Sequence, residues 1–154
     1  MHCRACGGLT KPQKGVLHRK CSACGAMDWM NPAPAVGLAS VEQGRVLLSR
    51  RAGPPMQGYW DLVGGFMEPG ETPDEAVARE VKEETGCLLT DLDVRAVAPG
   101  TYDGRPTLNF LATGRLVGTP KAGDDSAELK WHPLDDLPRL AWAHEKAFLE
   151  HLRG

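Results

Sequence analysis

The chain has 154 residues, of which 42% are hydrophobic and 25% are charged, and its formal net charge is -2. These values fit one compact domain with a small appendage, and they exclude a global basic field that would attract nucleic acid over the whole surface. The sequence holds no apolar run of transmembrane length and does not start like a secretory signal, so we expect no membrane partner and a cytoplasmic location.

The first expected element is a zinc ribbon over residues 1–30. Its four candidate ligands form two Cys-x-x-Cys-Gly units and are Cys3, Cys6, Cys21 and Cys24. Four thiolates in a tetrahedral arrangement suit Zn²⁺, and a segment of about 30 residues needs bound metal to fold because its apolar core is too small. A redox pair or a disulfide is less consistent with two such units in a cytosolic chain. Because four thiolates complete the shell, we expect a structural zinc.

A linker with two prolines, residues 31–34, separates the ribbon from a main domain over residues 35–154. Strands are expected over residues 35–41, 46–49, 59–63, 88–97, 107–117 and 129–132. A helix should begin at the capping box of Thr72 and Glu75, with Pro73 in its first turn, and end at Gly86. A second helix is expected over residues 141–152. This order predicts an α/β fold with a mixed sheet between helices.

The first predicted helix of the main domain carries an acidic cluster. Glu80, Glu83 and Glu84 occur at i, i+3 and i+4, so they share one side of the helix. Each like-charge pair costs roughly 0.2–0.5 kcal/mol, and folding alone offers no compensation. A divalent cation such as Mg²⁺ takes oxygen ligands, retains water and activates it for phosphoryl chemistry. Taken alone, the acidic run would fit a solvated face; the wider spacing from Gly65 to Gly86 favours a metal site.

That wider spacing resembles the Nudix box, G-x5-E-x7-R-E-U-x-E-E-x-G-U, in which U is aliphatic. The matching residues are Gly65, Glu71, Arg79, Glu80, Val81, Glu83, Glu84, Gly86 and Cys87. Cys87 stands at an aliphatic position, where free cysteine packs as a small hydrophobe. The flanking segments Trp60-Asp61-Leu62 and Trp131-His132-Pro133-Leu134 also look like the family, so the resemblance covers about residues 35–152.

The resemblance implies an α/β/α sandwich that hydrolyses the pyrophosphate bond of a nucleoside diphosphate linked to a group X, with Mg²⁺ or Mn²⁺ as cofactor. The metal ligands that it implies are the Gly64 carbonyl, Glu80, Glu83 and Glu84. Glu71 and Arg79 are expected to form a supporting ion pair. The general base is a box glutamate or one of the later carboxylates Asp124, Asp125 and Glu128; an ordinary solvated loop is the alternative for the last three.

A zinc ribbon followed by this domain resembles the NADH pyrophosphatases, including those that remove NAD caps from RNA. Their SQPWPFPxS-type segment is absent, and the arrangement also resembles zinc-ribbon members grouped with ADP-ribose and FAD pyrophosphatases. The candidate substrate contacts are rings and cations: Tyr59, Phe66, Tyr102, Phe110, Arg50, Arg51 and Arg105. The expected products from an adenosine substrate are AMP and X-phosphate.

Two other functions stay open. One is nucleoside triphosphate sanitation, which releases a nucleoside monophosphate and pyrophosphate. The other is a non-catalytic zinc-ribbon binding protein, since the ribbon is locally basic through Lys11, Lys14, Arg19 and Lys20. The expected partner is a small nucleotide, with nucleic acid only as a capped RNA end and a homodimer as an open alternative.

Overall fold

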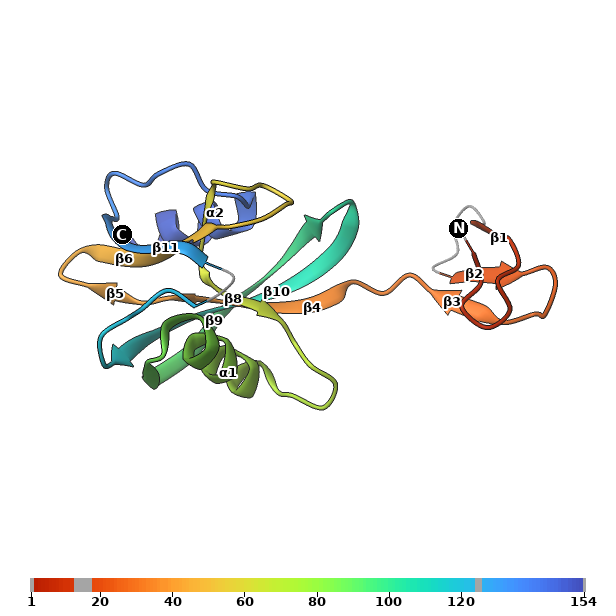
Figure 1. Ribbon diagram of the computed structural model, residues 1–154, viewed down its shortest axis with the longest axis horizontal. Coiled ribbons are helices and arrows are strands. Elements are labelled where there is room, and N and C mark those ends of the chain that lie inside the picture. The colour runs from red at the N-terminus through yellow and green to blue at the C-terminus, as the bar shows by residue number, and fades with distance from the viewer. Residues whose placement is uncertain (1, 13–17, 124–125, 154) are drawn as a thin grey trace. The chain divides into compact units, whose positions relative to one another are not determined.

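The computed structural model describes residues 2–12, 18–123 and 126–153. The chain forms two compact units, Met1–Pro32 and Ala33–Gly154 (Figure 1). Lys14, Asp124 and Asp125, which the sequence analysis singles out, lie outside the described residues.

The first unit is built on a three-stranded antiparallel sheet. Its strands, in sheet order, are β1 (Thr10–Pro12), β2 (His18–Cys21) and β3 (Met27–Trp29). Two tight turns carry the cysteine pairs: Gly7 N donates to Cys3 O at 2.9 Å, and Gly25 N donates to Cys21 O at 3.0 Å. Both glycines have a positive φ, 72° and 74°, which a residue without Cβ adopts at no steric cost. The repeated Cys-x-x-Cys-Gly pattern therefore builds the same turn twice.

The second unit contains two four-stranded sheets and two helices. The first sheet has the order β8 (Val63–Phe66), β4 (Ala33–Ala39), β10 (Arg105–Val117) and β9 (Leu88–Tyr102). Only its β4–β10 pair is parallel among the described residues, so the sheet is mixed. The second sheet has the order β11 (Ser126–Pro133), β6 (Arg45–Arg51) and β5 (Val41–Glu42), and β7 (Trp60–Asp61) also pairs with β6.

The helices α1 (Pro73–Thr85) and α2 (Ala143–His151) lie on opposite sides of the sheets (Figure 1). Each buries its apolar side chains in a separate core cluster. Val77 and Val81 of α1 pack with residues that include Val36, Leu38, Leu47 and Val63. Phe148 and Leu149 of α2 pack with residues that include Ala39, Val46, Leu48, Leu62 and Leu111. The predicted α/β/α arrangement with a mixed sheet is thereby confirmed.

Helix α1 begins and ends where the sequence predicts. Thr72 accepts a hydrogen bond from Glu75 N at 3.3 Å, and the Glu75 carboxylate accepts one from Thr72 N at 2.8 Å. Gly86 closes the helix in the left-handed conformation, with φ 72°. Such caps contribute on the order of 1 kcal/mol each to helix stability. Here they fix where α1 begins and ends, and therefore where along the helix the acidic residues lie.

Most strands begin and end within three residues of their predicted bounds, and two larger differences matter for the site. Strand β9 runs on to Tyr102 because it pairs with β10 through a two-residue turn at Asp103-Gly104, whose φ values are 49° and 71°. The run expected over residues 59–63 divides into β7 and β8, since β7 pairs with β6 and β8 pairs with β4. The chain therefore crosses between the two sheets at Leu62.

Neither helix in the described part of the chain has the length and apolar character of a membrane span.

Candidate functional site

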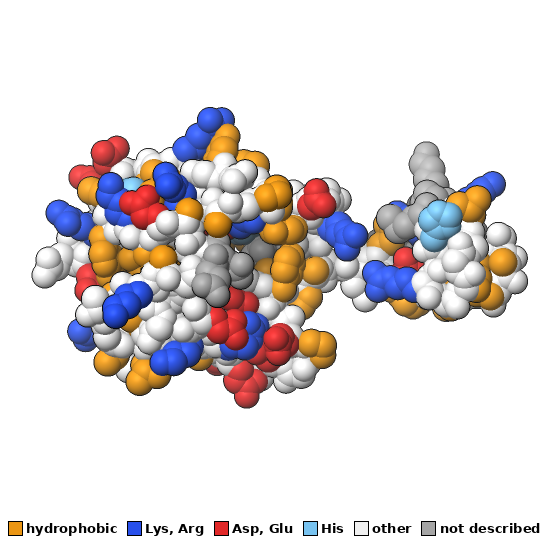
Figure 2. Space-filling view, viewed as in Figure 1, with side chains coloured by type: hydrophobic (Ala, Val, Ile, Leu, Met, Phe, Trp, Pro, Cys, Tyr) orange, Lys and Arg blue, Asp and Glu red, His pale blue; other side chains and the backbone are white. Residues whose placement is uncertain are grey.

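A single arginine organises the acidic cluster on α1. The guanidinium of Arg79 donates to both carboxylate oxygens of Glu71, at 2.6 and 3.0 Å. It also donates to Glu80 Oε1 at 2.8 Å and to Glu83 Oε2 at 3.1 Å. A further bond to the carbonyl of Phe66, at 3.0 Å, ties the helix to the end of β8. We call these residues the Arg79 cluster; acidic side chains gather over α1 in the space-filling view (Figure 2).

The carboxylates of this cluster are in unequal environments. Arg79 lowers the pKa of Glu71 to about 2, chiefly by hydrogen bonding to its ionised form. Burial raises the pKa of Glu80, whose side chain is 13% exposed, and the negative charges of Glu83 and Glu71 raise it further. The Glu83 side chain is 59% exposed. The cluster thus presents one open carboxylate beside one that is largely enclosed.

The glycine pair at the start of β8 lets the sheet approach this cluster. A Cβ on Gly65 would lie 2.5 Å from Glu80 Oε1, and a Cβ on Gly64 would overlap the carbonyl oxygen of Val36. Gly64 N also donates to Glu84 Oε2 at 3.1 Å. A side chain at Gly65 would collide with Glu80, and a side chain at Gly64 would collide with the backbone of β4. Carboxylate oxygens are the ligands that a hard divalent cation takes, but among the described residues only the four cysteines bring three or more such ligand atoms within 4.8 Å of one another.

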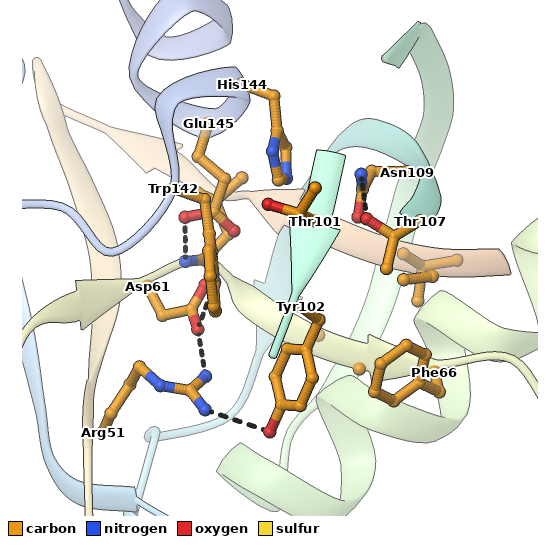
Figure 3. A pocket seen from close by; sticks show the side chains of 15 residues that line it. Arg51, Asp61, Phe66, Thr101, Tyr102, Thr107, Asn109, Trp142, His144 and Glu145 are labelled. Carbon is orange, nitrogen blue, oxygen red and sulfur yellow. Dashed lines mark hydrogen bonds and ion pairs between the residues drawn. The ribbon is translucent and has the colours of Figure 1, made fainter. Parts of the chain in front are cut away.

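Two adjoining cavities begin at this glycine pair. They share seven lining residues: Arg51, Asp61, Leu62, Gly64, Gly65, Phe66 and Tyr102. One cavity reaches Glu84 and the loop at residues 52–54. The other reaches α2 and is lined also by Thr107, Asn109, Trp142, His144 and Glu145 (Figure 3). Glu84 of the acidic cluster therefore lines a cavity that adjoins the one reaching α2.

Arg51 organises this pocket. It donates to Asp61 Oδ2 at 2.6 Å and lies 3.4 Å from the Tyr102 hydroxyl, while Trp142 Nε1 donates to the same Asp61 oxygen at 3.1 Å (Figure 3). The guanidinium carbon of Arg51 also lies 5.6 Å from the ring centroid of Tyr102 and 5.4 Å from that of Trp142. Phe66 meets Tyr102 edge to face at 5.1 Å. We call these five residues the Arg51 cluster: aromatic faces around an ion pair.

Glu145 lies behind this cluster and is 4% exposed. It accepts a hydrogen bond from Leu62 N at 3.3 Å. Burial raises the pKa of Glu145 well above its usual range, and the nearby charge of Asp61 raises it further. Burial therefore favours the neutral form of this carboxyl, which can donate a hydrogen bond as well as accept one.

The wall opposite Glu145 is polar and ordered. Asn109 Nδ2 donates to Ala98 O at 3.2 Å and to Thr107 Oγ1 at 3.0 Å. His144 also faces this space, and burial lowers its pKa, so it is a neutral imidazole at physiological pH. The pocket combines rings, one ion pair and several neutral polar groups, which is the composition of a site for a polar aromatic ligand.

The cysteines of the ribbon form a separate cluster. The sulfurs of Cys3, Cys6, Cys21 and Cys24 all lie within 4.8 Å of one another. The Cys3–Cys24 and Cys6–Cys21 sulfur pairs are 3.7 and 3.6 Å apart. A Zn–S bond length of about 2.3 Å places the sulfurs of a tetrahedral site about 3.8 Å apart, so these residues could hold zinc.

The structure brings together only some of the predicted substrate contacts. Phe66, Tyr102 and Arg51 line both cavities, whereas Arg50 and Arg105 line neither. Successive side chains of a strand point to opposite faces, which turns Arg50 away from its neighbour. Arg50 instead lies 3.6 Å from Glu128 on β11.

Two predicted stacking rings also have other roles. Tyr59 lies under the guanidinium of Arg139, 4.5 Å from ring centroid to guanidinium carbon. Phe110 packs against the core cluster on the α1 side. Neither ring lines the two cavities described above.

Sequence reasoning missed the part of the pocket that α2 and β10 supply. Trp142, Asn109 and Glu145 show no motif spacing. Glu145 did carry one signal: it precedes Phe148 and Leu149 by three and four residues, so it occupies the apolar stripe of its helix. An acidic residue in that stripe indicates a buried carboxyl.

Fold and site together define a hydrolase of the Nudix class. Residues 31–152 match the NUDIX domain, and the chain belongs to that family. It is an enzyme of the class that acts on phosphorus-containing anhydrides, as the sequence predicted.

Several known proteins are similar to this chain. An ADP-ribose pyrophosphatase of Methanocaldococcus jannaschii is 36% identical over 129 residues, which cover 81% of this chain and 76% of that protein. The NAD-capped RNA hydrolase NudC of Vibrio vulnificus is 30% identical over 139 residues, which cover 90% of this chain; the chain spans about half of that relative, 53%. The crystal structure of a NUDIX hydrolase from Nitrosomonas europaea superimposes with a TM-score of 0.74 at 25% identity, covering 99% of this chain and 92% of the other.

Proposed function

We propose that this protein hydrolyses the pyrophosphate bond of a nucleoside diphosphate linked to a group X, releasing a nucleoside monophosphate and X-phosphate. The observation that carries the proposal is that the cavity around the Arg51 cluster adjoins, through Gly64 and Gly65, a cavity lined by Glu84 of α1. A nucleoside in the pocket would extend its phosphates toward those carboxylates. The similarity to an ADP-ribose pyrophosphatase supports this substrate class.

We propose Glu80, Glu83, Glu84 and the Gly64 carbonyl as the residues that hold Mg²⁺ or Mn²⁺. All are oxygen donors, and the glycine pair leaves the space that a Cβ would fill. When bound, the ion polarises phosphoryl oxygens and lowers the pKa of a coordinated water.

The other residues of the Arg79 cluster would orient these ligands. Arg79 fixes Glu71 and Glu80 through its fork of donors and leaves Glu83 largely exposed. We propose Glu83 as the first candidate for the proton acceptor. Glu128 is the second candidate, and it is paired with Arg50 on β11. The pH profile of Glu128→Gln tests the second candidate, since the loss of the base removes the acidic limb of the profile, whereas Glu83→Gln also removes a proposed metal ligand.

The rings of Phe66, Tyr102 and Trp142 would hold the base by stacking and edge contacts. Asp61 would offer an acceptor, and Glu145 in its neutral form would offer a donor, on the side of the pocket next to α2. Together these groups would exclude water from the nucleoside and fix the direction in which the phosphates leave the pocket.

Product analysis tests the proposal directly. The zinc-loaded protein would be incubated with Mg²⁺ or Mn²⁺ and with ADP-ribose, NADH, NAD, FAD or nucleoside triphosphates. AMP with a second monophosphate supports the proposal and names X. Pyrophosphate from a triphosphate would instead support the sanitation reaction. An absence of turnover of every compound in this panel, with the fold intact, would contradict the proposed substrate class.

A second candidate substrate is RNA with a 5′ NAD cap. The match to NudC covers 139 residues, more than the Ala33–Gly154 unit contains, so it extends into the ribbon. The test is cleavage of a short NAD-capped RNA into nicotinamide mononucleotide and a 5′-monophosphate RNA. Efficient cleavage of ADP-ribose with no cleavage of this RNA would exclude the second candidate.

A further inference from the structure

One face of the ribbon sheet has a composition that folding does not explain. In the register of the sheet, Lys11 lies opposite Lys20, Lys20 lies opposite Met27, and His18 lies opposite Trp29. Directly opposed residues point to the same face of a sheet, as do residues two apart on one strand. The five side chains therefore share one face, which we call the lysine–tryptophan face.

The other face of this sheet is the one that meets the cysteine cluster. Thr10 and Cys21 lie opposite each other there and are 5% and 1% exposed. The lysine–tryptophan face is open by contrast: Met27 is 54% exposed and Trp29 is 56% exposed. A tryptophan more than half exposed on a small domain leaves most of its large ring outside the core.

Charge separates the two faces further. Two lysines placed directly opposite each other destabilise a strand pair. In the described part of the chain, neither Lys11 nor Lys20 forms a salt bridge. Asp28 belongs to the other face and lies 4.0 Å from Arg4. The lysine–tryptophan face therefore has positive charge with no carboxylate to neutralise it.

The charge of the whole chain is divided in the same direction. Residues 1–32 contain five Lys or Arg and one Asp, whereas residues 33–154 contain thirteen Lys or Arg and nineteen Asp or Glu. A zinc tetrathiolate, with two negative charges, would leave the ribbon positive. The overall net charge of -2 conceals this division. Basic side chains are also prominent on the ribbon in Figure 2.

The aromatic groups of the face form a small platform. The rings of His18 and Trp29 lie 4.9 Å apart at 55°. Exposed rings interleaved with lysines are the elements that hold single strands, because bases stack on the rings while cations contact the phosphates. A duplex has no free base faces to offer to such a platform.

We propose that the lysine–tryptophan face docks single-stranded RNA, with a base on Trp29 and phosphates against Lys11 and Lys20. The choice of RNA rests on the proposed function, since RNA with a nucleotide cap is a single strand that carries a pyrophosphate bond at its 5′ end. The docking itself requires no hydrolysis.

Binding is measured by fluorescence anisotropy with a 3′-labelled 12-nucleotide RNA that has a 5′ hydroxyl, without Mg²⁺ or Mn²⁺. We expect binding that weakens with salt. The double variant Lys11→Gln, Lys20→Gln should lower the slope of log affinity against log salt by about 1.4, at about 0.7 for each single-strand phosphate contact. Trp29→Ala should bind at least about fivefold more weakly, and Trp29→Phe should restore most of that loss.

The matched control is Lys130→Gln, Lys146→Gln, which removes the same charge from the other unit and should leave the salt slope unchanged. Zinc content and melting temperature show whether each ribbon variant still folds. Hydrolysis of ADP-ribose by the same variants, which should be unchanged, separates a failure of docking from a failure of the proposed catalytic function.

The proposal is overturned if the wild-type protein does not bind the RNA at 50 mM salt, if the control loses as much affinity as the ribbon double variant, or if duplex RNA binds as tightly. It is also overturned if Trp29→Ala abolishes a concentration-dependent dimer and RNA does not bind. That last result would assign the face to a second copy of the chain.

Discussion

The Arg79 cluster and the Arg51 cluster both place an arginine among carboxylates, yet they use charge differently. In the Arg79 cluster, Glu71 has a lowered pKa, which favours its ionised form, and the Glu83 carboxylate is largely exposed. This cluster therefore presents carboxylate charge at the surface. In the Arg51 cluster, Asp61 pairs with the arginine, and Glu145 behind it is buried and has a raised pKa. The first arrangement suits cation binding, and the second suits recognition of a neutral polar group.

The clusters also differ in how the chain assembles them. All residues of the Arg79 cluster lie between Phe66 and Glu83. The Arg51 pocket draws on β6, β7, β9 and the N-terminal end of α2 (Figure 3). Chemistry can thus be held by one local element while recognition depends on several distant ones.

The largest expected effect is the loss of a carboxylate from α1. Glu83→Gln or Glu84→Gln should reduce kcat by at least about a hundredfold. Losing a residue that only orients a metal ligand typically lowers activity about 10- to 100-fold, and losing a proposed ligand itself should lower it more. Stability without divalent metal should stay equal or rise slightly, since like charges are removed. Steady-state kinetics and thermal unfolding check both.

Glu42→Gln is the matched control, because Glu42 is exposed on β5 and remote from these carboxylates along the chain. Normal turnover in Glu83→Gln and Glu84→Gln would refute the assignment of metal ligands.

Arg79→Lys should come next in size. Lysine keeps the positive charge but lacks the planar fork that contacts Glu71, Glu80 and Glu83 together. We expect a loss of about 1–3 kcal/mol in the free energy of unfolding at pH 7. Chemical denaturation measures it.

This loss should depend on pH in a defined direction. The stabilising contribution of Glu71 is present above its unfolded pKa and disappears as pH falls toward its folded pKa of about 2. The difference between wild type and Arg79→Lys should therefore shrink in strong acid. A difference that is constant from pH 7 to pH 2.5 would contradict the role given to this pair.

Glu145→Gln tests the buried side of the comparison. The folded state raises the pKa of Glu145, so the wild-type carboxyl stabilises the fold fully below its unfolded pKa and progressively less as pH rises toward the folded pKa. Glutamine keeps an acceptor for Leu62 N and has no proton to lose. The melting temperature of the variant relative to wild type should rise from pH 5 to pH 8.

Glu150→Gln, on the exposed side of the same helix, provides the control and should show no such trend. A pH-independent difference for Glu145→Gln would mean that Glu145 is ionised in the folded protein.

The smallest effect is expected for Tyr102→Phe. The hydroxyl lies 3.4 Å from Arg51, so its loss should cost less than about 1 kcal/mol. The ring and its contact with Phe66 remain. We expect a severalfold rise in KM at most, with kcat unchanged. A large fall in kcat would show that Tyr102 acts in the chemical step and not only in substrate binding.

What the sequence by itself determined lies within short stretches of chain. The capping box of Thr72 and Glu75 defines the start of α1, and a helical repeat then places Glu80, Glu83 and Glu84 on one side. Each Cys-x-x-Cys-Gly unit likewise builds its own turn. Local geometry repeats wherever these patterns occur, so spacing alone predicts which side chains meet.

Only the tertiary structure decided the pocket and the open face of the ribbon. Arg51 meets Asp61 because β6 and β7 pair, and Glu145 approaches both because α2 packs on that side of the sheets. The grouping of Lys11 with Trp29 likewise depends on the register of three strands. A shift of one residue in strand pairing reverses which side chains share a face, and the register depends on the turns and on the partner strands as well as on the strand's own pattern.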